Sequence, residues 1–261
     1  MDNKTEELLY GKKKKLTLPS KHYVVIREQN GADDDLISNQ TLAEDLSNID
    51  MFLSSLILET DLPFANANKK LDKKSIREML IKDKYFVLFA SRIHSMGSEV
   101  RFTFKWGEEE DELEYTEDLN IFVWDYAKPF PKEDDEEYRE EMIEPYESNP
   151  YNPVEATLTS GKQIRFERLN GKSEKYLMGL DEITRNAIYK ARGLEQFYED
   201  KWQKVTNFMY FSKKDMAELN KIVKAADPEF TGSTKLENPK TKQVIDYPIM
   251  RAESFFYPEE I

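Results

Sequence analysis

Carboxylates are the side chains of this sequence that gather densely enough to suggest chemistry. They are concentrated in three runs, at residues 33–35, 108–112 and 133–141. Clustered carboxylate oxygens are the ligands that Mg²⁺ and Ca²⁺ prefer. None of the runs has the spaced Asp-x-Asp-x-Asp-Gly pattern of a calcium loop, and neighbouring acids in a continuous run point in different directions. The runs therefore favour hydrated surface over a metal or catalytic site, and we expect no bound metal.

The other residue types used in catalysis are scarce or lack partners at a useful spacing. His22 and His94 are the two histidines, and neither belongs to a His-x-x-x-His or Glu-x-x-His pair. The chain has no cysteine, which excludes disulfides, thiolate zinc sites and cysteine nucleophiles. The glycine-rich nucleotide loops and the Gly-x-Ser-x-Gly elbow are missing too. We therefore expect a protein that is not an enzyme and that has no cofactor and no small-molecule substrate.

Composition indicates the class of protein and its partners. The 14 Tyr, 15 Phe and 3 Trp provide more bulky apolar surface than disordered chains carry, so we expect a folded protein. The net charge of −13 would repel phosphate, which argues against a nucleic-acid partner. Residues 1–20 contain no signal-peptide pattern, and apolar runs such as 85–90 are too short to span a bilayer. We expect a soluble, intracellular protein with no membrane partner.

The spacing of apolar residues predicts an α+β fold. Helical spacing predicts helices over 43–58, from Ser75 to Leu80, from Asp83 to a break at Gly97, and over 175–197 and 212–227. Alternation predicts strands at 24–26 and 120–126. It also predicts two hairpins, one pairing 100–106 with 112–115 and one pairing 234–237 with 243–248. A short helix is expected over 134–143.

One stretch of the sequence occurs twice. Residues 17–31 and 157–171 align without a gap after a shift of 140 residues, and five of the 15 positions are identical. Both copies end in an Asn-Gly pair, Asn30 with Gly31 and Asn170 with Gly171, and both keep apolar residues at the same alternate positions. Helical patterns and then a hairpin follow each copy. We therefore expect a duplicated module, the alternative being that two α+β domains share this order by chance.

The repeat divides the chain into four parts. We expect a polar tail at 1–15, an N-terminal α+β module at 16–126, an acidic connection at 127–153 and a C-terminal α+β module at 154–261. The connection contains five prolines, which are typical of a segment between two domains. The tail ends in four lysines at 12–15, which are interpreted as a solvated end or as an electrostatic handle for a partner.

Aromatic residues near the C-terminus are candidates for contacts with other proteins. Phe255, Phe256 and Tyr257 lie together beside Pro258. Aromatic side chains at a chain end either pack into their own fold or contact a neighbour. We expect them to pack on the C-terminal module, and the alternative is a contact point in a larger assembly. Trp106 and Trp124 complete the set of candidate interaction residues.

Three patches of the sequence together point to a known family. The first is LPSK at 18–21, followed by a strand that ends in Arg27 and by the acids at 33–35. The second, LIKDKYFVLFASRIHSMG at 80–97, contains Asp83, Arg92, Ser95 and Gly97, and the third is FFYP at 255–258. In these patches the chain resembles the baseplate hub and tail-assembly family of contractile-tailed bacteriophages.

The resemblance suggests which residues form the shared motif and where the chain departs from it. The motif positions, with the repeated glycines, are Pro19, Ser20, Arg27, Gly31, Asp83, Arg92, Gly97 and Gly171. Lys84 stands where the family pattern has arginine. Some members carry a Cys-x-x-Cys zinc ribbon after the second patch. This chain has FTFKWGEEED there and no cysteine, so a zinc requirement does not carry over.

The resemblance implies a non-enzymatic structural or assembly protein of a phage tail baseplate. Such a protein would dock onto other tail or baseplate proteins, or onto itself, in the host cytoplasm during assembly or in the virion. Two other functions remain open. One is an acidic adaptor or DNA-mimic inhibitor that binds a basic partner through residues 108–118 and 133–144. The other is a metal-dependent nuclease or hydrolase that uses the acids at 33–35 and 108–112.

Overall fold

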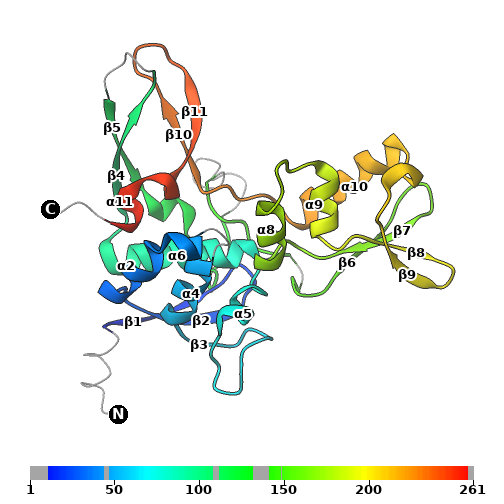
Figure 1. Ribbon diagram of the computed structural model, residues 1–261, viewed down its shortest axis with the longest axis horizontal. Helices are drawn as coiled ribbons and strands as arrows, with labels where there is room; N and C mark the ends of the chain where they lie inside the picture. Colours follow the sequence, from blue (N-terminus) through cyan, green and yellow to red (C-terminus); the bar gives the residue numbers. More distant parts are fainter. Residues whose placement is uncertain (1–10, 44–46, 108–111, 132–140, 148, 258–261) are drawn as a thin grey trace.

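The computed structural model describes residues 11–43, 47–107, 112–131, 141–147 and 149–257, and confirms an α+β protein. Two bodies lie side by side, and the second projects from the first (Figure 1). Each has its own hydrophobic core. No helix among the described residues is long and apolar enough to cross a membrane.

The first body is built on an antiparallel three-stranded sheet with helices packed against it. Its strands are β1 (Lys13–Thr17), β2 (Tyr23–Arg27) and β3 (Ile57–Thr60), in the order β1-β2-β3. Its helices are α2 (Gly31–Ile37), α3 (Gln40–Ala43), α4 (Ser47–Leu56), α5 (Lys73–Ile76) and α6 (Ile81–Met96). The middle of α6 is buried on nearly every side, so this helix is the centre of the first core.

Two hairpins and the end of the chain complete the first body. The hairpins are β4 (Glu99–Lys105) with β5 (Glu112–Asp118) and β10 (Ser233–Glu237) with β11 (Val244–Pro248). They lie side by side (Figure 1), with the Phe102 and Tyr247 rings stacked at 4.9 Å. Short helices η1 (Leu119–Phe122), η3 (Ile249–Arg251) and α11 (Glu253–Phe256) also pack against the first core.

The second body spans 154–226. Its antiparallel sheet has the order β6-β7-β8-β9, formed by Val154–Thr157, Gln163–Phe166, Glu195–Tyr198 and Lys201–Lys204. Its helices are α8 (Gly171–Met178), α9 (Arg185–Ala191), η2 (Phe208–Tyr210) and α10 (Lys213–Ala226). Leu219 and Val223 of α10 pack into a core that also contains Leu158, Ile164 and Phe166.

The repeated stretch has the same local structure at both of its places in the chain. β1 pairs with β2 so that Thr17 lies opposite Tyr23, and β6 pairs with β7 so that Thr157 lies opposite Gln163, which keeps the offset of 140 residues. In the turn of each hairpin, the residue at Lys21 or at the equivalent Gly161 has a positive φ, of 66° and 83°. The two bodies therefore begin with the same hairpin in the same register.

An asparagine cap follows each hairpin. The Asn30 side chain accepts a hydrogen bond from the backbone of Ala32 at the start of α2. The Asn170 side chain accepts from the backbone of Lys172 and Ser173 at the start of α8. Such a side chain satisfies amides that the first helical turn leaves without partners. The repeated Asn-Gly pair is thus the start of a helix in both bodies.

The C-terminal hairpin packs with the first core, although its sequence belongs to the second module. Leu236, Ile249 and Phe255 are buried there, and the second core ends at Ala226. The connection at 127–153 also packs against the first body, because Ile143 is fully buried in its core and Tyr146 donates its backbone N–H to the Pro19 carbonyl. The chain therefore leaves the first body, builds the second and returns.

Several predicted elements differ from the observed ones. Residues 120–126 form no strand, because Asp118 caps η1 and accepts from the backbone of Asn120 at 3.1 Å. Asp72, not Ser75, caps the helix that follows it, and the Ser75 backbone donates to its carboxylate at 2.7 Å. The helix predicted over 134–143 falls largely outside the described residues.

Strands replace helix or tail at three further places. β3 occupies the end of the helix predicted over 43–58, since it pairs with β2. The end of the helical pattern at 175–197 forms β8, after Gly193 with φ of 60° ends α9. Lysines 13–15 of the expected tail form the first half of β1. In each case the pairing partner lies in another segment, which short-range periodicity does not reveal.

Candidate docking surface

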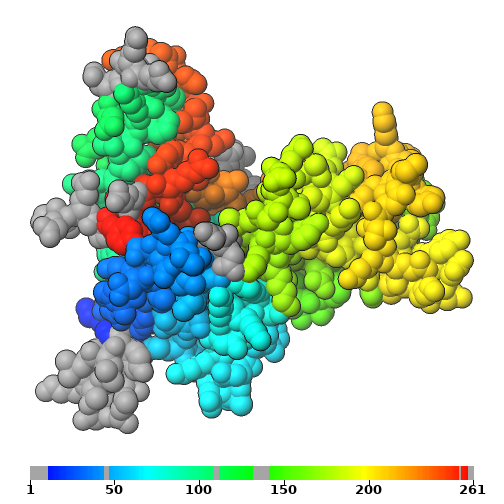
Figure 2. All heavy atoms as spheres, viewed as in Figure 1, coloured from blue at the N-terminus to red at the C-terminus, as the bar shows by residue number. Residues whose placement is uncertain are grey.

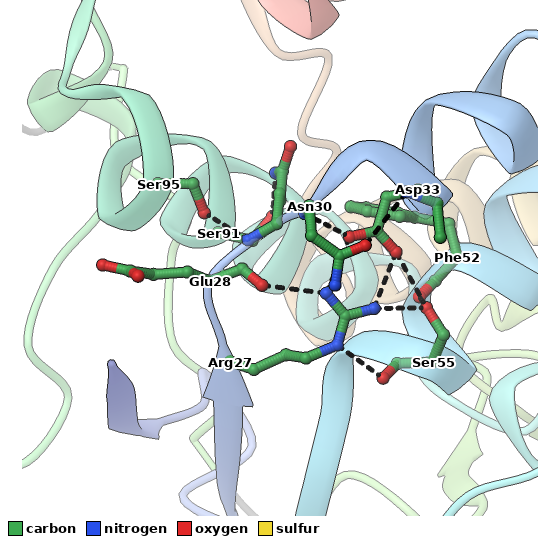
Figure 3. Close-up of polar contacts among 10 residues, drawn as sticks. Arg27, Glu28, Asn30, Asp33, Phe52, Ser55, Ser91 and Ser95 are labelled. Atoms are coloured by element: carbon green, nitrogen blue, oxygen red, sulfur yellow. Dashed lines mark hydrogen bonds and ion pairs between the residues drawn. The ribbon is translucent and has the colours of Figure 1, made fainter. Parts of the chain in front are cut away.

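The acidic run at 33–35 serves the fold instead of a metal site (Figure 3). Asp33 is buried, and its carboxylate accepts two hydrogen bonds of 2.7 Å from the Arg27 guanidinium. It also accepts from the Asn30 backbone at 2.8 Å and the Ser55 hydroxyl at 3.1 Å. This bidentate pair occupies the oxygens and fixes the start of α2. Asp34 and Asp35 are exposed and point elsewhere.

The other two acidic runs lie mostly outside the described residues, which include only Glu112 of the first and Glu141 of the second. Across the part of the chain that the structure describes, no group of three or more His, Asp or Glu side chains is placed to hold a metal ion. Of the histidines, His22 lies 3.3 Å from Asp61, and His94 contacts the Lys12 carbonyl at 3.0 Å.

Two buried aspartates occupy equivalent places in the two bodies. Each is the third residue of its helix, Asp83 in α6 and Asp215 in α10. Asp83 accepts from the Ser20 backbone and from the Tyr151 hydroxyl, both at 3.1 Å. Asp215 accepts from the Lys162 ammonium at 2.8 Å. Ser20 and Lys162 both belong to the repeated hairpin turns, so each aspartate fastens a turn to a helix.

The environments of these aspartates shift their pKa values in opposite directions. Burial raises the pKa of Asp83 to about 6, against the effect of hydrogen bonds from Ser20 and Tyr151. The hydrogen bond from Lys162, assisted by Ser160 and Ser212, holds the pKa of Asp215 well below its usual range. Asp83 is fully buried, so a substrate could not reach its oxygens. The contacts of both carboxylates are those of fold-stabilising groups.

The remaining motif residues of the second patch join α6 to its surroundings. The Arg92 guanidinium donates to the carbonyls of Phe255 at 2.8 Å, Gly97 at 2.7 Å and Glu99 at 3.3 Å. The Ser95 hydroxyl accepts from the Gln29 backbone at 2.9 Å. These contacts connect α6, β4 and the end of the chain. The motif residues thus stabilise the first body and do not form a docking surface.

The candidate aromatic residues are mostly buried or half-buried. Phe255 is 1% exposed and lies in the first core against Phe89, which corrects its expected place on the C-terminal module. Phe256 is half-buried, packs on Phe255 and lines an apolar cavity of about 220 Å³ beside α6. Tyr257, 37% exposed, is the most exposed member of the predicted set.

The two tryptophans of that set are half-buried. Trp106 donates its ring N–H to the Tyr115 hydroxyl at 2.7 Å. Trp124 packs edge-on against Phe130 with ring centres 6.4 Å apart. Both rings therefore make contacts within the first body.

The exposed apolar surface lies instead in the second body. Eight large apolar side chains are exposed among the described residues, and six of them are in this body: Tyr176, Met178, Ile183, Tyr198, Met209 and Tyr210. Figure 2 shows the second body projecting away from the first. We define the distal cluster as Tyr198, Met209 and Tyr210. Met209 is 86% exposed and Tyr210 is 77% exposed, which is unusual for side chains of this size.

Local sequence explains how the distal cluster is displayed. Asn207 caps η2, and its side chain accepts from the Met209 backbone at 2.9 Å. In a 3₁₀ turn, residues three apart share a face. Phe208 and Phe211 accordingly turn inward toward the core, with Phe208 packed on Tyr189. Met209 and Tyr210, between them, must face solvent.

A cavity adjoins the distal cluster. It has a volume of about 500 Å³, and Tyr198 and Tyr210 line it together with Gln196, Gln203 and Phe211. Exposed charged side chains surround this region at positions 199, 200, 201 and 204. An aromatic centre with a charged rim is the usual anatomy of a protein–protein contact. Sequence reasoning missed this surface, although the Asn cap and the spacing of Phe208 and Phe211 could have revealed it.

In comparisons with known proteins, no family model, curated protein or solved structure matches the chain.

Proposed function

We propose that this protein is a non-enzymatic structural or assembly component of a phage tail baseplate and that it acts by docking onto other tail proteins. The resemblance of residues 18–35, 80–97 and 255–258 supplies the class of particle. The distal cluster supplies the docking surface.

The observation that carries the proposal is the display of large apolar side chains on a projecting body. Tyr198, Met209 and Tyr210 are exposed, yet the turn that presents Met209 and Tyr210 is capped by Asn207 and anchored in the core by Phe211. An ordered surface loses little conformational freedom on binding, and tyrosine is enriched among the residues that dominate binding energies. A surface of this kind suits a permanent contact.

The resemblance supports the proposal through the fold of the first body. Arg27, Asp83 and Arg92 each hold separate segments together through buried hydrogen bonds. Residues with such a role define a scaffold, and related scaffolds can carry different surfaces. The first body would then be the part shared with the family, and the second body would carry the specific contact.

The test is whether the chain depends on the distal cluster to enter tail structures. A tagged chain is produced in infected cells, and tail particles and assembly intermediates are separated by sedimentation. The triple variant Tyr198→Ser/Met209→Ser/Tyr210→Ser should be lost from these fractions by about tenfold or more, since removing a few central contacts weakens an interface by that factor.

The matched control is Tyr176→Ser/Met178→Ser/Ile183→Ser, which removes three other exposed apolar side chains from the same body. It should sediment with the particles as the unchanged chain does. If the unchanged chain is missing from both particles and intermediates, the proposed function is wrong. If both triple variants remain bound, the docking surface lies elsewhere.

A further inference from the structure

The two parts of the chain carry net charges of opposite sign. Residues 154–226 contain 14 Lys and Arg against 10 Asp and Glu, a net charge of +4. The rest of the chain has a net charge of −17, which with this +4 gives the total of −13. The second body is thus basic on an otherwise acidic protein. A bipolar distribution of this kind favours association between opposite poles.

One face of α10 carries four of the fourteen Lys and Arg residues of the second body. We define the lysine face as Lys213, Lys214, Lys221 and Lys224, which are all exposed. At 100° per residue they fall within a stripe of about 100°. The opposite stripe contains Leu219 and Val223, which are buried in the core. None of the four lysines forms an ion pair with any residue that the structure describes.

An acidic surface of similar length lies on the first body. On β5 the exposed positions alternate, and Glu112, Glu114 and Asp118 point outward from the β4–β5 hairpin. Their partners across the hairpin are Lys105, Thr103 and Glu99, so two of the three acids face no cation there. The acidic row of β5 spans about 20 Å. The lysine face spans about 16 Å along α10.

These two surfaces cannot meet within one molecule. Ile81 donates its backbone N–H to the Leu169 carbonyl at 3.0 Å, and Gly171 donates to the Met79 carbonyl at 3.1 Å, so the bodies are joined by main-chain hydrogen bonds. The buried Lys84 ammonium, which pairs with Asp50 of its own body at 3.3 Å, also forms an ion pair with Glu174 of the second body at 2.8 Å. In this fixed arrangement α10 and the β4–β5 hairpin lie far apart (Figure 1).

We propose that the lysine face of one copy binds the outer face of the β4–β5 hairpin of a second copy. The contact joins two different surfaces, so a pair of copies retains one free surface of each kind, the lysine face on one copy and the hairpin face on the other. Repeated head-to-tail contacts of this type produce a ring when the rotation closes and a chain when it does not. This inference concerns contacts between copies, and it does not require the docking onto other tail proteins proposed above.

Sedimentation velocity over a range of protein concentrations tests the proposal through charge reversal. The lysine-face variant is Lys213→Glu/Lys214→Glu/Lys221→Glu/Lys224→Glu, and the hairpin variant is Glu112→Lys/Glu114→Lys/Asp118→Lys. The control, Lys12→Glu/Lys14→Glu/Lys70→Glu/Lys74→Glu, makes the same change in net charge as the lysine-face variant, but at exposed lysines of the first body.

The unchanged chain and the control should associate at about 0.1 M salt and separate at about 1 M, where charges are screened within about 3 Å. Each reversed variant alone should show an association constant lower by about tenfold or more. An equimolar mixture of the two variants should restore association, because the acidic α10 of one then meets the basic hairpin of the other. Circular dichroism checks that both variants are folded.

The proposal is overturned if the unchanged chain stays monomeric at every concentration, whether or not its lysines bind duplex DNA. It is also overturned if the mixture of reversed variants fails to associate. A monomer that still sediments with tail particles would refute this inference alone and leave the proposed function standing.

Discussion

Replacing Gly171 with alanine should weaken the junction between the two bodies, whereas the same change at Gly31 should not. Both glycines follow a capping asparagine and are the first residue of a helix. A Cβ atom at position 171 would lie 3.0 Å from the Arg77 Cα and 3.2 Å from its carbonyl oxygen, and 3.2 Å from the Lys84 ammonium. At Gly31 no atom lies within 4 Å of the added Cβ.

The difference between the two variants sets the expected magnitude. Two of the close contacts of Gly171 are with backbone, which cannot rotate away, so α8 must move relative to residue 77. Overpacking of this kind costs about 1–3 kcal/mol. The movement would also stretch the hydrogen bond of 3.0 Å from the Lys172 backbone to the Arg77 carbonyl. Gly31→Ala should instead be neutral or stabilise by about 0.4–1 kcal/mol, because alanine restricts the unfolded chain.

Urea unfolding and amide hydrogen exchange together measure the effect. Gly171→Ala should lower the free energy of unfolding and speed exchange at Ile81 and Lys172, whose amides bridge the bodies. Gly31→Ala should leave both readouts at wild-type values or slightly more protected. Equal stability and equal exchange in the two variants would refute the reasoning, since the close approach at Gly171 would then impose no constraint.

Four further changes test the roles assigned to buried residues. Phe255→Ala should cost about 3–5 kcal/mol in urea unfolding because the ring is in the core, and a loss below 1 kcal/mol would contradict that placement. Asp33→Asn leaves the Arg27 charge buried without its carboxylate and should cost about 3–5 kcal/mol, whereas a neutral result would show that the pair is solvated. Burial raises the folded-state pKa of Asp83 above its unfolded value. The free energy of unfolding of the wild-type protein should therefore fall by roughly 3 kcal/mol from this group as the pH rises from about 4 to about 6. Asp83→Asn should remove that fall. The depressed pKa of Asp215 acts in the opposite sense, because its contribution to stability is lost as the pH falls. Asp215→Asn should therefore flatten the acid side of the plot of unfolding free energy against pH. Equal slopes of this plot in the Asp83→Asn and Asp215→Asn variants would contradict the assignment.

Features that depend on neighbours in the sequence were predictable. The hairpins β4–β5 and β10–β11 follow from alternating side chains around short turns, and both are present. The repeat was visible because both copies place an Asn-Gly pair after alternating apolar residues, and the structure shows that each asparagine caps the helix that follows. A cap acts through hydrogen bonds to residues two or three positions away, so residue types alone reveal it.

The candidate docking surface was only partly within reach of the sequence. Phe255 and Tyr210 are both aromatic residues next to other aromatic residues, and composition does not separate them. The first is in the core and the second is 77% exposed. Exposure depends on which segments return to cover a residue, and the end of the chain covers α6, not the second body.

The sequence by itself determined the α+β class, the repetition of residues 17–31 at 157–171, and the lack of any cysteine chemistry. The tertiary structure decided which repeated residues acquired a further role. Gly31 and Gly171 are equivalent in sequence, but a backbone from the other body approaches Gly171 alone. Asp83 and Asp215 are equivalent in their helices, but one is buried without a cation and the other binds Lys162. The physical reason is that close approach, burial and charge pairing are set by distant segments, and the sequence records no distances between them.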